Sequence, residues 1–235
     1  MGDVWAIVVA GGSGSRFGDA APKQFLDLGG LRLIDWALAA ASAACGGVVA
    51  VLPAAHLDAT LPPGVVSVAG GSTRSGSVRA GLEAVPADAA VIVVHDAARP
   101  LADSALFERV IAAVRAGADG AVPGVPVADT IKRVDPADGL VLETLDRPTL
   151  RAIQTPQAFA AGALRQAHAG GGDATDDAAL VEVAGGRVVV VEGDPSNLKV
   201  TGPEDLVRAE DLLTRRSPGV GGRPPDRGGV SRQRQ

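Results

Sequence analysis

The sequence predicts an α/β fold with a mostly parallel, twisted sheet and helices on both of its faces. Short runs of β-branched residues recur along the chain and are apolar at nearly every position, as is typical of strands buried on both faces. Segments with apolar residues at helical spacing lie between these runs. Strands that alternate with helices pair in parallel through right-handed crossovers, and ligands then bind at the carboxyl ends of the strands.

The expected elements follow from these two patterns. Strands are predicted at residues 6–9, 48–52, 65–68, 90–94 and 188–191. Helices are predicted at residues 33–41 and 106–114, and Asp103 is a suitable N-cap for the second helix. A chain of 235 residues is long enough for one sizeable core, so we expect a single domain over residues 1–215.

The alternation of strands and helices is interrupted between residues 123 and 150. Residues 130–134 and 140–144 have the composition of short strands and flank a turn-like segment at 135–139, which predicts an inserted β-hairpin arm. The edges of such a hairpin need cover, so the arm either packs against a second subunit or is an uncovered surface excursion. The pattern by itself leaves both interpretations open.

Composition excludes several classes of function. No apolar run approaches the roughly 18–20 residues of a membrane-spanning helix, and the first residues lack a secretory signal, so we expect a cytoplasmic protein without a membrane partner. A net charge of −5 and 3% aromatic residues disfavour nucleic-acid binding. The single cysteine, Cys45, cannot form an internal disulfide and is expected to be buried. Gly, Pro and Arg dominate residues 216–235, which predicts a disordered tail.

A glycine-rich loop follows the first predicted strand. It contains Ala10, Gly11, Gly12 and Gly14, whose small side chains let backbone N–H groups approach an anion such as a triphosphate. The loop lacks the third glycine of a dinucleotide fingerprint and the Gly-Lys-Ser/Thr ending of a P-loop. Two nearby cations, Arg16 and Lys23, can fold toward the same phosphate chain.

Several segments resemble the motifs of the 2-C-methyl-D-erythritol 4-phosphate cytidylyltransferases. The first three lie at residues 10–25, 70–78 and 94–100. Further matches are Asp129-Thr130, Asp146-Arg147 and residues 154–157, 175–177 and 197–201. The resemblance covers about residues 4–214 and implies a single Rossmann-like nucleotidyltransferase domain that uses CTP and a polyol phosphate and releases pyrophosphate.

This reaction joins two anions, so it depends on positioning and on neutralising charge. By the resemblance, Arg16 and Lys23 stabilise charge on the triphosphate, and Lys199 aligns the phosphate of the acceptor. Arg147, at the end of the arm, is implied to bind that phosphate across a dimer interface, with Thr130 and Thr155 nearby. The resemblance and the arm together predict a homodimer.

Asp96 follows an apolar strand at its carboxyl end, where a carboxylate can hold Mg²⁺ together with triphosphate oxygens. The resemblance implies this role, whereas an isolated Asp96 would be read as a cap or turn residue. Ala97 and Arg99 belong to the same motif and are assigned to the nucleotide site, although Arg99 also suits a neighbouring carboxylate. His95 is predicted to be structural, because a phosphate monoester nucleophile is already ionised near neutral pH.

The residues Gly71, Ser72 and Ser77 resemble the pocket that selects cytosine. Ser77 also suits the N-terminus of a helix, because apolar residues at helical spacing follow it. Three positions depart from the family pattern: Gly11 replaces a usual alanine, Leu31 a frequent proline and Asp177 a common glutamate. None of these departures removes a charged catalytic position.

Two other functions remain open at this point. Related cytidylyltransferases that act on another polyol phosphate, such as ribitol 5-phosphate, resemble this chain through the first three motifs. A nucleotide-binding regulatory protein that has lost turnover would keep the fold, although the intact set of basic residues argues against it.

Overall fold

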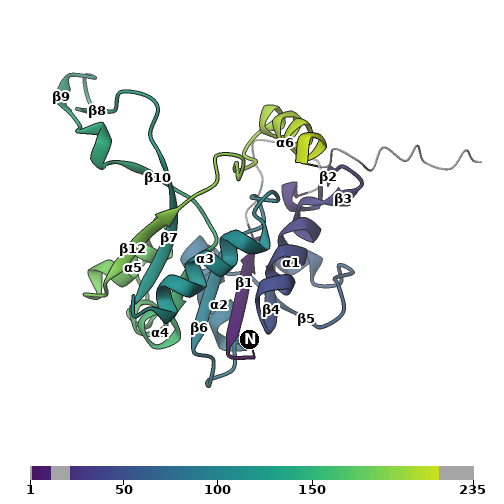
Figure 1. Cartoon of the computed structure of the whole chain (residues 1–235). Helices are drawn as coiled ribbons and strands as arrows, with labels where there is room; N and C mark the ends of the chain where they lie inside the picture. Colours follow the sequence, from purple (N-terminus) through teal and green to yellow (C-terminus); the bar gives the residue numbers. More distant parts are fainter. Residues whose placement is uncertain (1, 12–21, 217–235) are drawn as a thin grey trace, which may run out of the picture.

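The computed structural model describes residues 2–11 and 22–216 and contains a central sheet of eight strands (Figure 1). From β10 the strand order is β10-β7-β11-β6-β1-β4-β5, and β12 also pairs with β7. The strands of this sheet are β1 (Val4–Val9), β4 (Gly47–Leu52), β5 (Val65–Ala69), β6 (Val91–Asp96), β7 (Gly120–Pro126), β10 (Arg151–Ile153), β11 (Gln157–Ala160) and β12 (Val188–Glu192).

Most of the pairing is parallel. Strand β1 pairs in parallel with β4 and β6, β4 pairs with β5, and β7 pairs with β12. Strand β11 runs antiparallel to β6 and β7, and β10 runs antiparallel to β7. The predicted α/β fold with a mostly parallel sheet is therefore confirmed.

Helices cover both faces of the sheet because successive strand residues point to opposite sides. In β1, Ala6 and Val8 join the apolar cluster beneath α1 (Leu33–Ala44) and α3 (Ser104–Arg115). Ile7 points the other way, into the cluster beneath α2 (Arg74–Ala84), α4 (Ala161–Ala169) and α5 (Asp177–Val183). Helices α1 and α3 lie where the helical spacing of apolar residues predicted them. The Asp103 side chain accepts a hydrogen bond from the N–H of Leu106 at 2.9 Å, as predicted for an N-cap.

A smaller layer closes one end of the sheet. Helix α6 (Pro203–Arg216) packs near the short strands β2 (Asp27–Leu28) and β3 (Leu31–Arg32) over a cluster that includes Leu28, Leu33 and Val200. Short 3-10 helices within the described part of the chain are η2 (Lys23–Phe25), η3 (Ala54–His56) and η4 (Arg147–Thr149). Arg216, assigned above to the tail, ends α6, and the rest of the predicted tail lies outside the described residues.

Burial of the strands differs from the prediction at the edges. Strands β1, β4 and β6 are buried on nearly every residue, but β5 and β12 are only partly buried. Both lie at an edge of the sheet, where one side lacks a neighbouring strand. The expectation of burial on both faces was therefore wrong for these two strands.

The predicted hairpin is present as a projecting arm. Strands β8 (Lys132–Val134) and β9 (Val141–Thr144) pair antiparallel in a separate sheet that extends away from the body (Figure 1). All residues of both strands are exposed. Cys45 is buried, as expected, and burial raises the pKa of its thiol to about 12. Among the described residues, no helix is both long enough and apolar enough to cross a bilayer.

Candidate active site

A cavity of about 390 Å³ opens at the carboxyl ends of the central parallel strands. Its walls come from the residues after β1 and β5, from the first turn of α2, from the end of β6 and from the loop after β12. Of the residues predicted for the site, the structure places these in its wall: Ala10, Gly11, Lys23, Gly71, Ser72, Ser77, Asp96, Ala97 and Lys199.

A second, smaller cavity of about 180 Å³ shares Arg74, Asp96 and Lys199 with the first. Its other walls come from Arg99, β10, the segment that joins β10 to β11, and the residues before α5. Thr155 lies in this wall, and so do the polar residues Gln154, Gln157, Thr175 and Asp176. The shared residues stand where the two cavities meet.

The glycines let two segments of the larger cavity approach each other. A Cβ atom on Gly11 would lie 3.1 Å from the Oγ of Ser77, and one on Gly71 would lie 2.8 Å from the backbone carbonyl carbon of Gly76. The second distance is shorter than real Cβ contacts show, so the loop before α2 needs glycine at position 71 to reach the helix. Predicted positions Gly12 and Gly14 lie outside the described residues.

Helix α2 begins earlier than the sequence indicated. Thr73 is its N-cap, and its hydroxyl oxygen accepts a hydrogen bond from the N–H of Gly76 at 3.0 Å. Ser77 lies one turn into the helix and donates its hydroxyl to the carbonyl oxygen of Thr73 at 3.0 Å. Ser77 therefore has no capping role.

Asp96 is the last residue of β6 and is buried at the junction of the two cavities. Its carboxylate lies 2.7 Å from the Nζ of Lys199 and 3.4 Å from the Nε of Arg74. Burial raises the pKa of this carboxyl, but the positive charges of Arg74 and Lys199 outweigh burial and lower it to about 2. Asp96 is therefore ionised throughout the physiological range.

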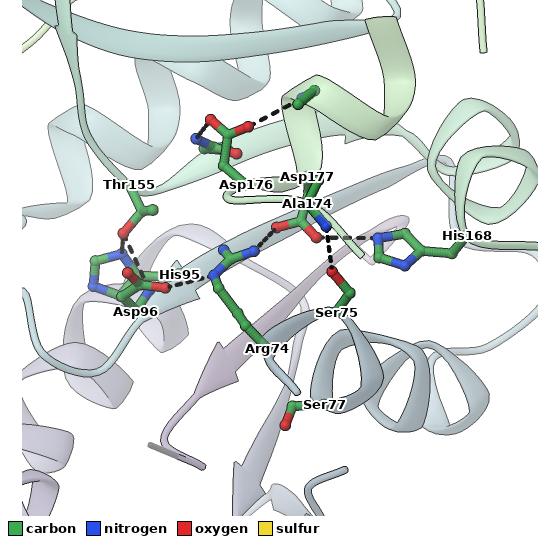
Figure 2. Close-up of polar contacts among 12 residues, drawn as sticks. Arg74, Ser75, Ser77, His95, Asp96, Thr155, His168, Ala174, Asp176 and Asp177 are labelled. Atoms are coloured by element: carbon green, nitrogen blue, oxygen red, sulfur yellow. Dashed lines mark hydrogen bonds and ion pairs between the residues drawn. The ribbon is translucent and has the colours of Figure 1, made fainter. Parts of the chain in front are cut away.

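Behind Asp96 lies a chain of buried hydrogen bonds that ends on His95 (Figure 2). The N–H of Asp96 donates to the Thr155 hydroxyl at 3.1 Å, and that hydroxyl lies 3.0 Å from Nδ1 of His95. The other ring nitrogen lies 3.2 Å from the carbonyl oxygen of Arg99, so it carries the proton. Burial lowers the pKa of His95 to about 4, and the neutral, fully bonded ring agrees with a structural role.

Two lysines from distant segments meet at the larger cavity. Lys23 donates to the backbone carbonyl of Val200 at 3.3 Å, next to Lys199 in the sequence. Lys199 itself donates to the carboxylate of Asp96. Arg16, the third predicted cation, lies outside the described residues, so its approach to the same cavity stays a prediction.

Arg99 is held by backbone groups. It donates to the carbonyl oxygens of Asn197 at 2.8 Å and of Ile153 at 3.4 Å. The alternative hydrogen-bonded pair with a carboxylate is not formed among the described residues. Arg99 instead connects β10 to the loop that carries Lys199, and it lines the smaller cavity.

The arm residues are not part of either cavity in a single chain. Arg147 and Thr130 are exposed, and Arg147 donates to the carbonyl oxygen of Ala128 at 2.7 Å within the arm. Thr155 lies beside Asp96, in the wall of the smaller cavity. Contact between the arm and an acceptor across a dimer interface stays a prediction.

The comparisons with known proteins agree with this geometry. Residues 4–215 match the family described as 2-C-methyl-D-erythritol 4-phosphate cytidylyltransferase. This chain belongs to that family. A relative of that name from Rhodococcus opacus is 48% identical over 218 residues, which cover 90% of this chain and 96% of the relative.

Solved structures of cytidylyltransferases from this family also match the fold. The crystal structure of the enzyme from Thermus thermophilus is 36% identical, with a TM-score of 0.73 over 88% of this chain and 98% of that one. A 4-diphosphocytidyl-2C-methyl-D-erythritol synthase from Anaerococcus prevotii is 28% identical, with a TM-score of 0.79 over 90% of this chain and 98% of that one.

Among the described residues, no group of three or more acidic, histidine or cysteine side chains could form a metal site by itself. Mg²⁺ at nucleotide sites needs only one or two carboxylates, because phosphate oxygens and water supply its other ligands. Asp96 is ionised and lies in the walls of both cavities. Its chemistry therefore fits a magnesium ion shared with a triphosphate.

Sequence reasoning assigned no role to Arg74, Gln154 or Gln157, although all three belong to quoted motifs. Arg74 contacts both Asp96 and Asp177, and Gln154 donates to the carbonyl oxygen of Asp194 in the loop before Lys199. One sequence signal could have found them. Each is a charged or amide residue inside a motif whose other members already had an assigned role. What each of them contacts depends on segments far away in the sequence.

Proposed function

We infer that this chain transfers the cytidylyl group of CTP to 2-C-methyl-D-erythritol 4-phosphate and releases pyrophosphate, in the non-mevalonate synthesis of isoprenoid precursors. The observation that carries this conclusion is the match to the family over residues 4–215, which contains both cavities. Lys23 and Lys199, from segments 176 residues apart, flank the same cavity, as the reaction of two anions requires.

The larger cavity suits CTP. Its volume of about 390 Å³ lies within the roughly 300–1,000 Å³ of small-molecule sites. Gly71, Ser72 and Ser77 provide backbone and hydroxyl groups that can hydrogen-bond a base, and Ala10 and Gly11 border the triphosphate side. Buried hydrogen-bonding partners discriminate cytosine from other bases far better than charge does.

The smaller cavity suits the polyol phosphate. Gln154, Gln157, Thr175 and Asp176 offer amide, hydroxyl and carboxylate groups to the hydroxyls of an acceptor. Arg99 and Lys199 offer positive charge to its phosphate. Because Lys199 belongs to both walls, the acceptor phosphate and the α-phosphorus of CTP meet beside it.

In the reaction, an oxygen of the acceptor phosphate attacks the α-phosphorus and the bond to the β-phosphate oxygen breaks. The nucleophile is already ionised, so no side chain has to remove a proton. Lys23 and Lys199 offset the charge on the phosphates, and we propose that Arg16 joins them. Neutral, buried His95 holds Thr155 and so supports the backbone at Asp96.

We propose Mg²⁺ as the metal cofactor, held by Asp96 and the phosphates of CTP. When bound, this ion would neutralise the triphosphate and orient it for in-line attack. The ionised carboxylate at the junction of the cavities supports this proposal.

We further propose that the protein is a homodimer in which the arm of one subunit brings Arg147 and Thr130 to the smaller cavity of the other. The exposed arm and its apolar residues support this proposal. A cytoplasmic location is part of the same proposal.

The test is pyrophosphate release by the purified full chain with CTP, Mg²⁺ and 2-C-methyl-D-erythritol 4-phosphate. We expect release that depends on all three components and that falls strongly when UTP replaces CTP or EDTA removes the metal. Release with ribitol 5-phosphate but not with 2-C-methyl-D-erythritol 4-phosphate would identify ribitol 5-phosphate as the acceptor instead. No release with any polyol phosphate would favour a protein that only binds nucleotide.

A further inference from the structure

Arg74 occupies a position between two buried carboxylates (Figure 2). Its Nε lies 3.4 Å from Oδ1 of Asp96, and its Nη1 lies 2.7 Å from Oδ2 of Asp177. As the first residue of α2, directly after the N-cap Thr73, its backbone is fixed by the start of the helix. Arg74 also lines both cavities, so it stands at the place where the two reactants meet.

Asp177 has no contact with either cavity and is fully buried. It is the first residue of α5, and its second carboxylate oxygen lies 3.0 Å from Nε2 of His168 on α4. His168 is 3% exposed and lies on the far side of Asp177 from Arg74 (Figure 2). A carboxylate with two opposed partners cannot rotate without losing one of them, so Asp177 is a rigid acceptor for Arg74.

Other contacts fix the segment before α5 against the start of α2. The N–H of Ala174 donates to the Ser75 hydroxyl at 3.3 Å, and the Thr73 hydroxyl donates to Asp173 at 2.8 Å. Arg79, one turn along α2, donates to the carbonyl oxygen of Gly172 at 2.9 Å. The rigid frame around Arg74 is therefore built by a segment about 100 residues away in the sequence.

We propose that Arg74 is a positioning residue, held by the buried pair Asp177 and His168, that sets the orientation of the Asp96 carboxylate at the junction of the cavities. The inference rests on the proposed function and adds a role for these three residues to it. The planar fork of Arg74 reaches both carboxylates at once, which the single ammonium of a lysine cannot do. Because Lys199 holds the other carboxylate oxygen, Asp96 is fixed from two sides.

The test compares variants of the full chain in the pyrophosphate assay, with CTP affinity measured by calorimetry. Asp177→Asn keeps the size of the side chain but removes the charge that holds Arg74. We expect kcat to fall by at least about tenfold, while the Kd for CTP changes by less than about threefold, because orientation is lost and binding groups remain. Asp177→Glu restores the charge, and kcat should recover to within about threefold of the parent.

Arg74→Lys provides a second route, because it changes a partly exposed side chain and keeps the charge. It should lower kcat by about tenfold or more, since lysine cannot bridge the two carboxylates. The matched control is Arg115→Gln, which removes an arginine of α3 that pairs with the exposed Asp3 outside both cavities. Its kcat should stay within about twofold of the parent.

The inference is overturned if Asp177→Asn and Arg74→Lys both keep kcat within about twofold of the parent. It is also overturned if the loss of activity in the variants is fully explained by a smaller fraction of folded protein at the assay temperature, as read from a thermal melt. A parent chain without pyrophosphate release would overturn the proposed function together with this inference. If the parent is active and the Asp177→Asn and Arg74→Lys variants keep its kcat, this inference is overturned and the proposed function is not.

Discussion

At the scale of single residues, the site is defined by charges of opposite sign at short range. The Nζ of Lys199 lies 2.7 Å from one carboxylate oxygen of Asp96, and the Nε of Arg74 lies 3.4 Å from the other. A buried carboxylate with two cationic partners stays ionised, as the lowered pKa of Asp96 shows. Lys199 can leave the carboxylate for a phosphate, because both kinds of group accept the same hydrogen bonds, whereas Arg74 is also held by buried Asp177.

Replacing Lys199 by alanine tests this exchange. We expect Lys199→Ala to lower kcat by about 10²–10³, the usual effect of removing one charge-stabilising donor. The fold should be little affected, because the Lys199 side chain is 41% exposed and partly exposed ion pairs contribute little stability. The measurement is steady-state pyrophosphate release together with a thermal melt.

Arg115→Ala is the control for that experiment. Arg115 is also a half-exposed cation in an ion pair, with Asp3, but it lines neither cavity. Its kcat should match the parent. If Lys199→Ala retained turnover within a few-fold of the parent, the assignment of charge stabilisation to Lys199 would be wrong.

At the scale of elements, α2 packs closely on the sheet, and this packing places the first turn of the helix in the wall of the larger cavity. Gly81 faces β1 and β4, and a Cβ atom there would lie 2.6 Å from Cγ2 of Ile7 and 3.1 Å from Cγ2 of Val51. The helix can therefore approach the strands more closely than any larger residue would allow. This approach places Ser77 against Gly11, which follows β1, and puts Arg74 in the wall of the larger cavity.

A pair of glycine substitutions tests the packing of α2. Gly81→Ala should destabilise the protein by about 1–3 kcal/mol, because overpacking outweighs the gain in helix propensity. Gly162→Ala in α4 has open space around the new methyl group and should stabilise by about 0.4–1 kcal/mol. Urea unfolding of both variants and the parent measures the difference. Equal effects at the two positions would contradict the packing argument.

At the scale of the whole molecule, the arm is the feature that a single chain leaves without a partner surface. Leu140, Val141 and Leu142 are 62%, 53% and 56% exposed, which is unusual for three consecutive apolar residues. An exposed two-stranded hairpin is marginally stable by itself. Packing on a second subunit would bury this surface and bring the arm near the smaller cavity.

The predicted dimer is tested by sedimentation velocity over a series of protein concentrations. The parent should sediment as a dimer, and Leu142→Asp should shift the equilibrium toward monomer, because a carboxylate would be buried without a partner. Val183→Asp is the control, since Val183 is 89% exposed and lies at the end of α5, away from the arm. A parent that stays monomeric at every concentration would rule out the proposed dimer.

Periodicity predicted the elements whose signals are local. The runs that became β1, β4 and β6 and the helices α1 and α3 are strongly patterned, and Asp103 caps α3 as expected. Strand β7 was not predicted, because Pro123, Gly124 and Pro126 interrupt its apolar run. Strands β10 and β11 were missed because each has only three or four residues.

The amino-acid sequence by itself determined the alternation of strands and helices, the glycine loop at the end of the first strand, and which residue types could hold phosphate. Tertiary structure decided which of those residues meet. Arg74 and Asp177 are 103 positions apart, as are Asp96 and Lys199. Their contacts depend on the order of the strands in the sheet and on the path of the crossover connections. A local sequence pattern predicts neither, because a strand has the same periodicity whichever neighbour it pairs with.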